Sequence, residues 1–212
     1  MCNLYSLTTT QSAITELVNL WRDDTGNLPE LAGIYPDYPA PVITKAPEGR
    51  VMQMMRWGMP SPAFALKGKK TDKGITNVRN TASPHWRRWL GPAHRCIVPF
   101  TSFAEPRHVN EEKPTNVWFA PAGPQETLFF AGIWTEWTSV RKLKEGETTN
   151  SLFAFLTVEP NGLVGPVHPK AMPVILRSPE AIAHWLDAPM EEALKLQRPF
   201  PDDGLKIVDG PV

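Results

Sequence analysis

The chain has 212 residues, of which 42% are hydrophobic and 21% charged, and its 22 basic and 22 acidic side chains cancel. This composition can bury one sizeable core and excludes a disordered chain. With no apolar run long enough to span a membrane and no signal peptide, we expect no membrane association and a cytoplasmic location. The two cysteines, Cys2 and Cys96, match no disulfide framework and no zinc spacing, so we expect a reducing compartment and no metal.

The predicted elements are mostly short strands, with helices near the two ends of the chain. Residues 8–23 are predicted as a helix, because Thr8 opens a capping box and apolar residues recur at helical spacing. Residues 28–41 are proline-rich and predicted to be irregular. Ser178 and Pro179 mark a helix start. Apolar runs predict strands over residues 51–57, 95–103, 128–137, 152–158, 172–176 and 205–208, with a polar hairpin tip at 142–150.

This succession of elements predicts an α+β fold. Strands this numerous, with helices only near the ends, favour a curled and largely antiparallel sheet. No proline-, glycine- or serine-rich linker separates two parts, so we expect a single domain over residues 1–212.

Charge is distributed unevenly along the chain. Residues 56–95 carry nine basic side chains against one acidic side chain, Asp72, which makes this window +8 and the remainder −8. Trp57, Trp86 and Trp89 are interleaved with those charges. Cations for phosphates and flat rings for bases are typical of a groove for single-stranded nucleic acid, although a solvated basic face with core tryptophans has the same composition. The basic residues are Arg56, Lys67, Lys69, Lys70, Lys73, Arg79, Arg87, Arg88 and Arg95.

Cys2 directly follows the initiator methionine. A free cysteine often packs as a small, inert hydrophobe, and this interpretation stays open. Removal of Met1 would instead leave an α-amine and a thiol on one residue. Such a pair can attack a carbonyl group with either atom.

Four further polar residues are candidates for chemistry. Glu105 lies at the end of an apolar run, where a carboxylate either caps a turn or shuttles protons with a raised pKa. His168 lies between a Gly/Pro loop and a predicted strand, where a structural histidine is the commoner case. Asn77 and Arg79 alternate as residues on one face of a strand do.

Six motifs occur in an order that resembles the SOS-response-associated peptidase family, whose members carry the SRAP domain and process abasic sites in DNA. They are the initial Met-Cys, WGMP, TNVRNT, HRCIVPFTSFAEP, FFAGIWTEW and VHPKAMPVIL, and they cover nearly the whole chain. The resemblance implies a barrel-like α+β domain that binds single-stranded DNA. It also implies no cofactor, a monomer, and association with the nucleoid when the protein is bound to DNA.

The resemblance also assigns roles to residues. By motif position Cys2 matches the nucleophile, and Asn77, Glu105 and His168 match the other active-site residues. The implied product is a thiazolidine crosslink between Cys2 and the aldehyde of an abasic site, with lyase cleavage as a side activity and self-removal of Met1. We expect the DNA groove to be lined by Arg79, Trp57, Arg87, Arg88, Lys69 and Lys70.

The sequence departs from the family pattern at three places. Asn3 and Leu4 replace the usual Gly-Arg, Pro106 replaces an aromatic residue after the glutamate, and Lys170 stands where an arginine is usual, with one extra residue before Met172. Two other functions stay open. One is an N-terminal-nucleophile amidohydrolase, and the other is a non-catalytic single-stranded DNA-binding protein with a structural Cys2.

Overall fold

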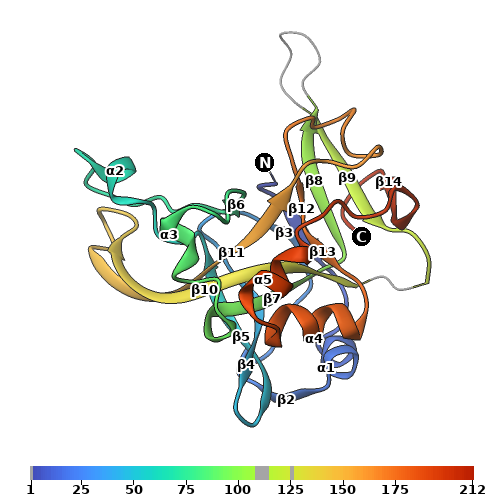
Figure 1. Ribbon diagram of the computed structural model, residues 1–212, viewed down its shortest axis with the longest axis horizontal. Coiled ribbons are helices and arrows are strands. Elements are labelled where there is room, and N and C mark those ends of the chain that lie inside the picture. Colours follow the sequence, from blue (N-terminus) through green and yellow to red (C-terminus); the bar gives the residue numbers. More distant parts are fainter. Residues whose placement is uncertain (1, 108–114, 125–126) are drawn as a thin grey trace.

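The computed structural model describes residues 2–107, 115–124 and 127–212, and its strands form two sheets (Figure 1). The smaller sheet has the order β14-β9-β8-β1-β3, and the larger follows β12-β11-β10-β7-β4-β5-β2, with β6 and β13 added on β11 and β10. The strands are β1 Tyr5–Leu7, β2 Leu20–Asp23, β3 Leu31–Ile34, β4 Pro39–Ala46, β5 Gly49–Trp57, β6 Asn77–Val78, β7 Arg95–Phe100, β8 Ser102–Arg107, β9 Thr115–Pro121, β10 Leu128–Val140, β11 Glu147–Val158, β12 Met172–Pro173, β13 Ile175–Leu176 and β14 Leu205–Val208. The α-helices are α1 Gln11–Val18, α2 Ala63–Leu66, α3 Pro84–Arg87, α4 Pro179–Asp187 and α5 Met190–Ala193, with single 3-10 turns at Pro92–His94, Leu194–Leu196 and Asp202–Gly204.

Part of the larger sheet closes into a barrel. β5 pairs with β4, β4 with β7, β7 with β10 and β10 with β11, all antiparallel. β11 then returns to β5 through a parallel pairing of Leu152 with Arg56 and of Phe153 with Trp57. Closure removes the free edges and turns one face of every strand inward. The predicted α+β fold around a curled, mostly antiparallel sheet is confirmed.

An aromatic cluster forms the core between the barrel and the smaller sheet. The ring of Tyr5 meets Trp57 edge-on at 5.2 Å between centroids and Phe130 at 5.6 Å. Trp57 also stacks on Phe155 at 5.2 Å. Rings packed in these geometries contribute beyond the area that they bury. Because Tyr5 belongs to β1, the cluster fixes the strand that begins three residues after Cys2.

The helix expected over residues 8–23 is shorter than predicted. α1 is capped by Thr10 rather than Thr8, since the Thr10 hydroxyl accepts a hydrogen bond from the Ala13 amide. It ends at Asn19, whose φ of 48° is left-handed. The following residues form β2, which pairs in parallel with β5. Sheet pairing therefore overrides the helical spacing after Val18.

Other boundaries differ where pairing is long-range. The segment 28–41, predicted to be irregular, contains β3, which pairs with β1 and places Ile34 opposite Tyr5. The expected strand 95–103 divides into β7 and β8, and the polar tip expected at 142–150 is partly strand, because β10 and β11 pair out to Val140 and Glu147. The Ser178 cap is confirmed, because its hydroxyl accepts from the Ala181 amide.

The last residues lie against the strands that carry the site. The Val212 carbonyl accepts hydrogen bonds from the hydroxyls of Ser6 and Thr101, with the Ser6 oxygen 3.1 Å away. The Val212 amide donates to the Ser102 hydroxyl at 3.3 Å. Ser6 is in β1 and Ser102 in β8, and their hydroxyls are 2.5 Å apart. Val212 therefore joins these two strands at one buried polar cluster.

Candidate active site around Cys2

Strand pairing places Cys2 beside Glu105. β1 and β8 are antiparallel neighbours, and the Leu4 carbonyl accepts a hydrogen bond from the Ala104 amide at 2.9 Å. The Cys2 side chain is fully buried, and its thiol donates to the Leu4 carbonyl at 3.5 Å. Two residues far apart in sequence therefore meet because the start of the chain is paired along β8.

Asn77 holds the backbone of Cys2 from a different strand. It belongs to β6, which pairs in parallel with β11 and places Asn77 opposite Phe155. Its Nδ2 donates to the Cys2 carbonyl at 2.9 Å and to the Thr76 hydroxyl at 2.8 Å. Its Oδ1 is buried and accepts no hydrogen bond from the residues that the structure describes.

Glu105 is a fully buried carboxylate next to His168. One of its oxygens, Oε2, lies 3.8 Å from Nδ1 of His168. Burial raises the pKa of Glu105 from 4.5 to about 7. A carboxyl group with a pKa near neutrality can both accept and return a proton at physiological pH.

The thiol of Cys2 is held in its neutral form. Burial, followed by the negative charge of Glu105, raises the pKa of Cys2 well above its usual value. A reactive thiolate at neutral pH depends on a lowered pKa, so this thiol is not a preformed thiolate nucleophile. The arrangement instead places a protonated thiol next to the carboxyl group of Glu105.

The loop that carries His168 is built by residues that the sequence did not indicate. Asn161 Oδ1 accepts from the Val164 amide at 2.9 Å, and its Nδ2 donates to the Phe200 carbonyl at 2.8 Å. The His168 amide then donates to the Val164 carbonyl at 2.9 Å.

Gln197 is a second residue that the sequence did not indicate. Its Nε2 donates hydrogen bonds to the carbonyls of Arg79 and Thr157. Single polar residues in loops carry no spacing signal, so only the fold identifies them.

Arg79 lies at the exposed margin of the site. Its guanidinium donates to the Lys170 carbonyl at 2.7 Å and lies 3.7 Å from the Glu159 carboxylate. About half of the side chain, 46%, remains exposed. Arg79 thus ties the end of β6 to the loop that carries His168 and Lys170.

Trp57 was expected to line a DNA groove, and the structure overturns this expectation. Its ring is completely buried, and its Nε1 donates to the Thr76 carbonyl at 3.1 Å. Trp86 and Trp89 are also buried, so the tryptophans of this window mostly belong to the core. Their alternation with charges reflects inward- and outward-facing positions.

The basic window keeps most of its charge at the surface. Arg95 is buried and donates to the carbonyls of Leu90, Trp185 and Ala188, and Arg56 is paired with Asp37. Neither contributes a free cation. The window residues that remain exposed are Lys67, Lys69, Lys70, Lys73, Arg79, Arg87 and Arg88.

At two of the three departures from the expected pattern, the structure shows which local contacts the residues make. Leu4 is buried, and the Asn3 Oδ1 accepts from the Thr76 hydroxyl at 3.1 Å, so no cation stands at either position. Lys170 is exposed, and its backbone rather than its side chain holds Arg79.

A large cavity lies away from these residues. It has a volume of about 1000 Å³ and lies between β5 and the β10–β11 hairpin, with Asp37, Arg56 and Lys142 in its lining. None of the residues around Cys2 lines it.

The chain matches the model of the family described as SOS response associated peptidase (SRAP) over residues 1–209. The chain belongs to this family. The family's description associates its members with the SOS response and with peptidase activity, in keeping with an enzyme. No curated protein matches the chain significantly.

Solved structures share the fold of this SRAP protein. A protein from Bordetella bronchiseptica is 24% identical over 97% of this chain and 98% of its own, with a TM-score of 0.75. A protein from Bacteroides thetaiotaomicron is 21% identical over 97% of this chain and 90% of its own, with a TM-score of 0.78. A phage-related protein from B. bronchiseptica is 20% identical over 98% and 93%, with a TM-score of 0.68.

Two searches of the described residues give negative results. No helix among them is both long and apolar enough to cross a bilayer. No group of three or more His, Cys, Asp or Glu side chains among them could hold a metal ion.

Proposed function

We propose that this SRAP protein binds single-stranded DNA and forms a covalent crosslink between Cys2 and an abasic site. The observation that carries the proposal is the arrangement at the start of the chain. Asn77 holds the Cys2 carbonyl, and the buried Glu105, with a pKa of about 7, lies beside both the thiol and His168. Membership of the SRAP family supports it.

The reaction begins with removal of Met1, in which water adds across the Met1–Cys2 peptide bond and frees the α-amine of Cys2. We assign the family's peptidase activity to this bond. A free α-amine has a pKa near ~8, so a useful fraction is neutral at physiological pH. The aldehyde comes from the DNA, because a sugar that has lost its base opens to expose one.

Two additions then form the crosslink. The amine attacks the aldehyde carbon, and loss of water leaves an imine. The thiol of Cys2 adds to the same carbon and its proton passes to the nitrogen, which closes a five-membered thiazolidine without any change of oxidation state. Because amine and thiol belong to one residue, closure is intramolecular, with effective molarities on the order of 10⁵ M or more.

The neighbouring residues handle protons and position. Glu105 takes a proton from the attacking amine and gives it to the departing water, and it then passes the thiol proton to the ring nitrogen. His168 donates to the sugar oxygen as the ring opens. Asn77 fixes the Cys2 carbonyl and so aims the amine, and Arg79 binds a flanking phosphate. The imine can also lose the 3′ phosphate by β-elimination, which would cleave the strand as a lyase does.

The deciding experiment mixes the protein with single-stranded DNA that carries one abasic site. We expect an adduct that survives heat and denaturant, and none with undamaged DNA, which offers no aldehyde. The intact mass of the free protein should lack one methionine. Binding without an adduct would favour a non-catalytic DNA-binding protein, and release of ammonia from glutamine by the thiol would favour an amidohydrolase; either result overturns the proposal.

A further inference from the structure

An exposed tryptophan lies beside a stacked arginine at the junction of α3 and the β10–β11 hairpin. The Arg88 guanidinium lies 4.0 Å from the centroid of the buried Trp89 ring and 5.7 Å from that of Trp137. The two indoles meet at 89° with centroids 6.1 Å apart. Trp137 keeps 37% of its surface exposed. We call Arg88 and Trp137 the Arg88–Trp137 platform.

The platform is preorganised. Arg88 Nη2 lies 3.2 Å from Nδ1 of His85, and His85 in turn contacts the edge of Trp89 at 5.2 Å. A guanidinium held over an indole ring still has N–H groups for hydrogen bonds to phosphate, and an exposed indole offers a face for a base. A side chain already fixed in place loses less conformational freedom when a ligand binds.

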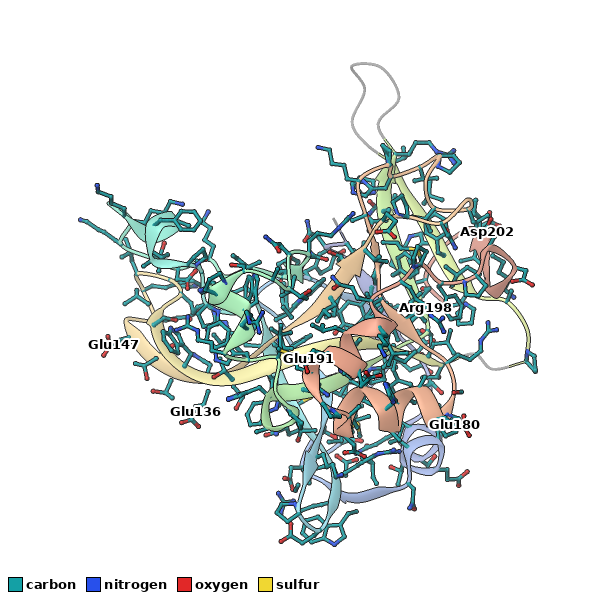
Figure 2. All side chains as sticks on the ribbon, in the orientation of Figure 1. Glu136, Glu147, Glu180, Glu191, Arg198 and Asp202 are labelled. Atoms are coloured by element: carbon teal, nitrogen blue, oxygen red, sulfur yellow. The ribbon has the colours of Figure 1, made fainter. Side chains whose placement is uncertain are left out.

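Only one face of the β10–β11 hairpin has a charge that suits nucleic acid. The face toward α3 is basic, and the opposite face is acidic. Successive residues of a strand point to opposite sides, so Glu136 and Trp137 face opposite ways. Figure 2 shows Glu136 and Glu147 along the side of the hairpin turned away from α3. Arg87 and Arg88 lie on the α3 side and are exposed.

The platform follows the site around Cys2 along the chain. Arg79 ends the segment that carries Asn77, and α3 begins five residues later. The chain between them turns tightly, with the Ser83 amide donating to the Asn80 carbonyl at 3.1 Å. In Figure 1, β6, α3 and the hairpin follow one another outward from the start of the chain.

We propose that the Arg88–Trp137 platform is a second nucleotide-binding position, which stacks a base and holds the phosphate of a nucleotide flanking the one at Cys2. The inference rests on the proposed function for the course of the strand, because DNA fixed at Cys2 and Arg79 continues along α3. The second position would bind an undamaged nucleotide, so its contribution to affinity is tested with DNA that has no abasic site.

The experiment measures binding of undamaged single-stranded oligonucleotides of increasing length to Trp137→Ala. Stacking of one base on an aromatic ring predicts a loss of about tenfold in affinity for long oligonucleotides, with little change for the shortest that bind. Trp137→Phe should keep most of the affinity, which separates a lost stacking surface from a misfolded hairpin. DNA should also quench the tryptophan fluorescence of the parent more than that of Trp137→Phe.

Trp21 provides a matched control. It is 50% exposed, and the Arg22 guanidinium lies 5.0 Å from its ring centroid, but Arg22 is paired with Asp24 at 2.9 Å. Trp21→Ala should leave affinity unchanged at every length. Equal affinities for Trp137→Ala and the parent, or equal losses for the two alanine variants, would overturn the platform. Crosslinking to an abasic site under saturating DNA tests the reaction at Cys2 separately.

Discussion

Cys2 and Cys96 are both completely buried, and burial raises the pKa of each thiol well above its usual value. Their surroundings differ. Cys96 lies within β7 and packs so closely on Gly132 that a Cβ atom at residue 132 would lie 2.8 Å from the Cys96 sulfur. The Cys96 carbonyl accepts a hydrogen bond from Trp185 Nε1 at 2.9 Å. Cys2 lies at the start of the chain beside Glu105. Burial alone therefore does not distinguish the two thiols. The neighbouring Glu105 carboxyl group and the position in the chain do.

The largest expected effect comes from removing the thiol of Cys2. Cys2→Ala should lose the heat-stable adduct by more than about 100-fold, because the ring cannot close, although an imine should still be trapped by borohydride. Cys96→Ala is the control: it should keep full crosslinking and lose about 1 kcal/mol of folding free energy through the small cavity that it leaves. Gel assays of both variants, with denaturant titrations, measure the two effects. If folded Cys96→Ala lost the adduct, the assignment of Cys2 as the nucleophile would be wrong.

Blocking the amine should make Cys2 as inert as Cys96. A tag or an uncleaved residue before Cys2 leaves the thiol intact but places its nitrogen in a peptide bond. We expect no crosslink on denaturing gels and unchanged binding of undamaged DNA. An equally stable adduct from the blocked protein would exclude the aminothiol mechanism and point to an internal lysine.

Replacing Glu105 should slow the reaction while stabilising the fold. Glu105→Gln should reduce the crosslinking rate by about 100-fold, as expected for loss of a general base. It should also remove the part of the pH dependence centred near 7, leaving the part that comes from the α-amine near ~8. A rate profile against pH for both proteins measures this change. His168→Ala is the comparison for this pH profile, because it keeps the Glu105 carboxylate and should therefore keep the pH dependence that comes from it.

The stability change has a defined sign. The folded pKa of Glu105 is about 7 against 4.5 unfolded, so the folded chain holds a proton that the unfolded chain has lost between these values. Parent stability should therefore fall as pH rises from 4.5 to 7. Glu105→Gln should be more stable than the parent by about 2–3 kcal/mol near pH 8 and equally stable near pH 4. A variant destabilised equally at both pH values would contradict a buried, ionisable Glu105.

The smallest effect is expected for the residue that only positions Cys2. Asn77→Ala should lose the bond to the Cys2 carbonyl, with about 1 kcal/mol of stability and about tenfold in crosslinking rate. Asn80→Ala, an exposed position three residues later, should change neither. If Asn77→Ala reacts at the parent rate, the carbonyl contact does not orient Cys2.

Elements that depend on local signals could be predicted from the sequence. The Ser178 cap and the strand at 205–208 agree with the structure, because capping and alternation act over a few neighbouring residues. β3 and the shortened α1 could not be predicted, since each depends on pairing with a distant strand. The prediction that Trp57 lines a DNA groove was wrong for a related reason. In a closed barrel, a residue between charged neighbours in the sequence can still face the interior.

The candidate site was predictable only in part. Family motifs indicated Cys2, Asn77, Glu105 and His168. Strand pairing brings Asn77 and Glu105 to Cys2, and a loop brings His168 to Glu105. Their residue types gave no sign that Glu105 would be fully buried, which is what moves its pKa. Asn161 and Gln197 have no motif and are identified only by the loops that they hold.

The contact of Val212 with Ser6 and Ser102 has a practical consequence for how the protein can be handled. A purification tag before Cys2 would cap the proposed amine, and a tag after Val212 would place new residues against the hydroxyl cluster that joins β1 to β8. The turn between β4 and β5 is a better attachment point, because Pro47 and Glu48 are exposed there and belong to neither strand. An affinity handle or fluorophore inserted at that turn would leave the nitrogen of Cys2 and the contacts of Val212 as they are.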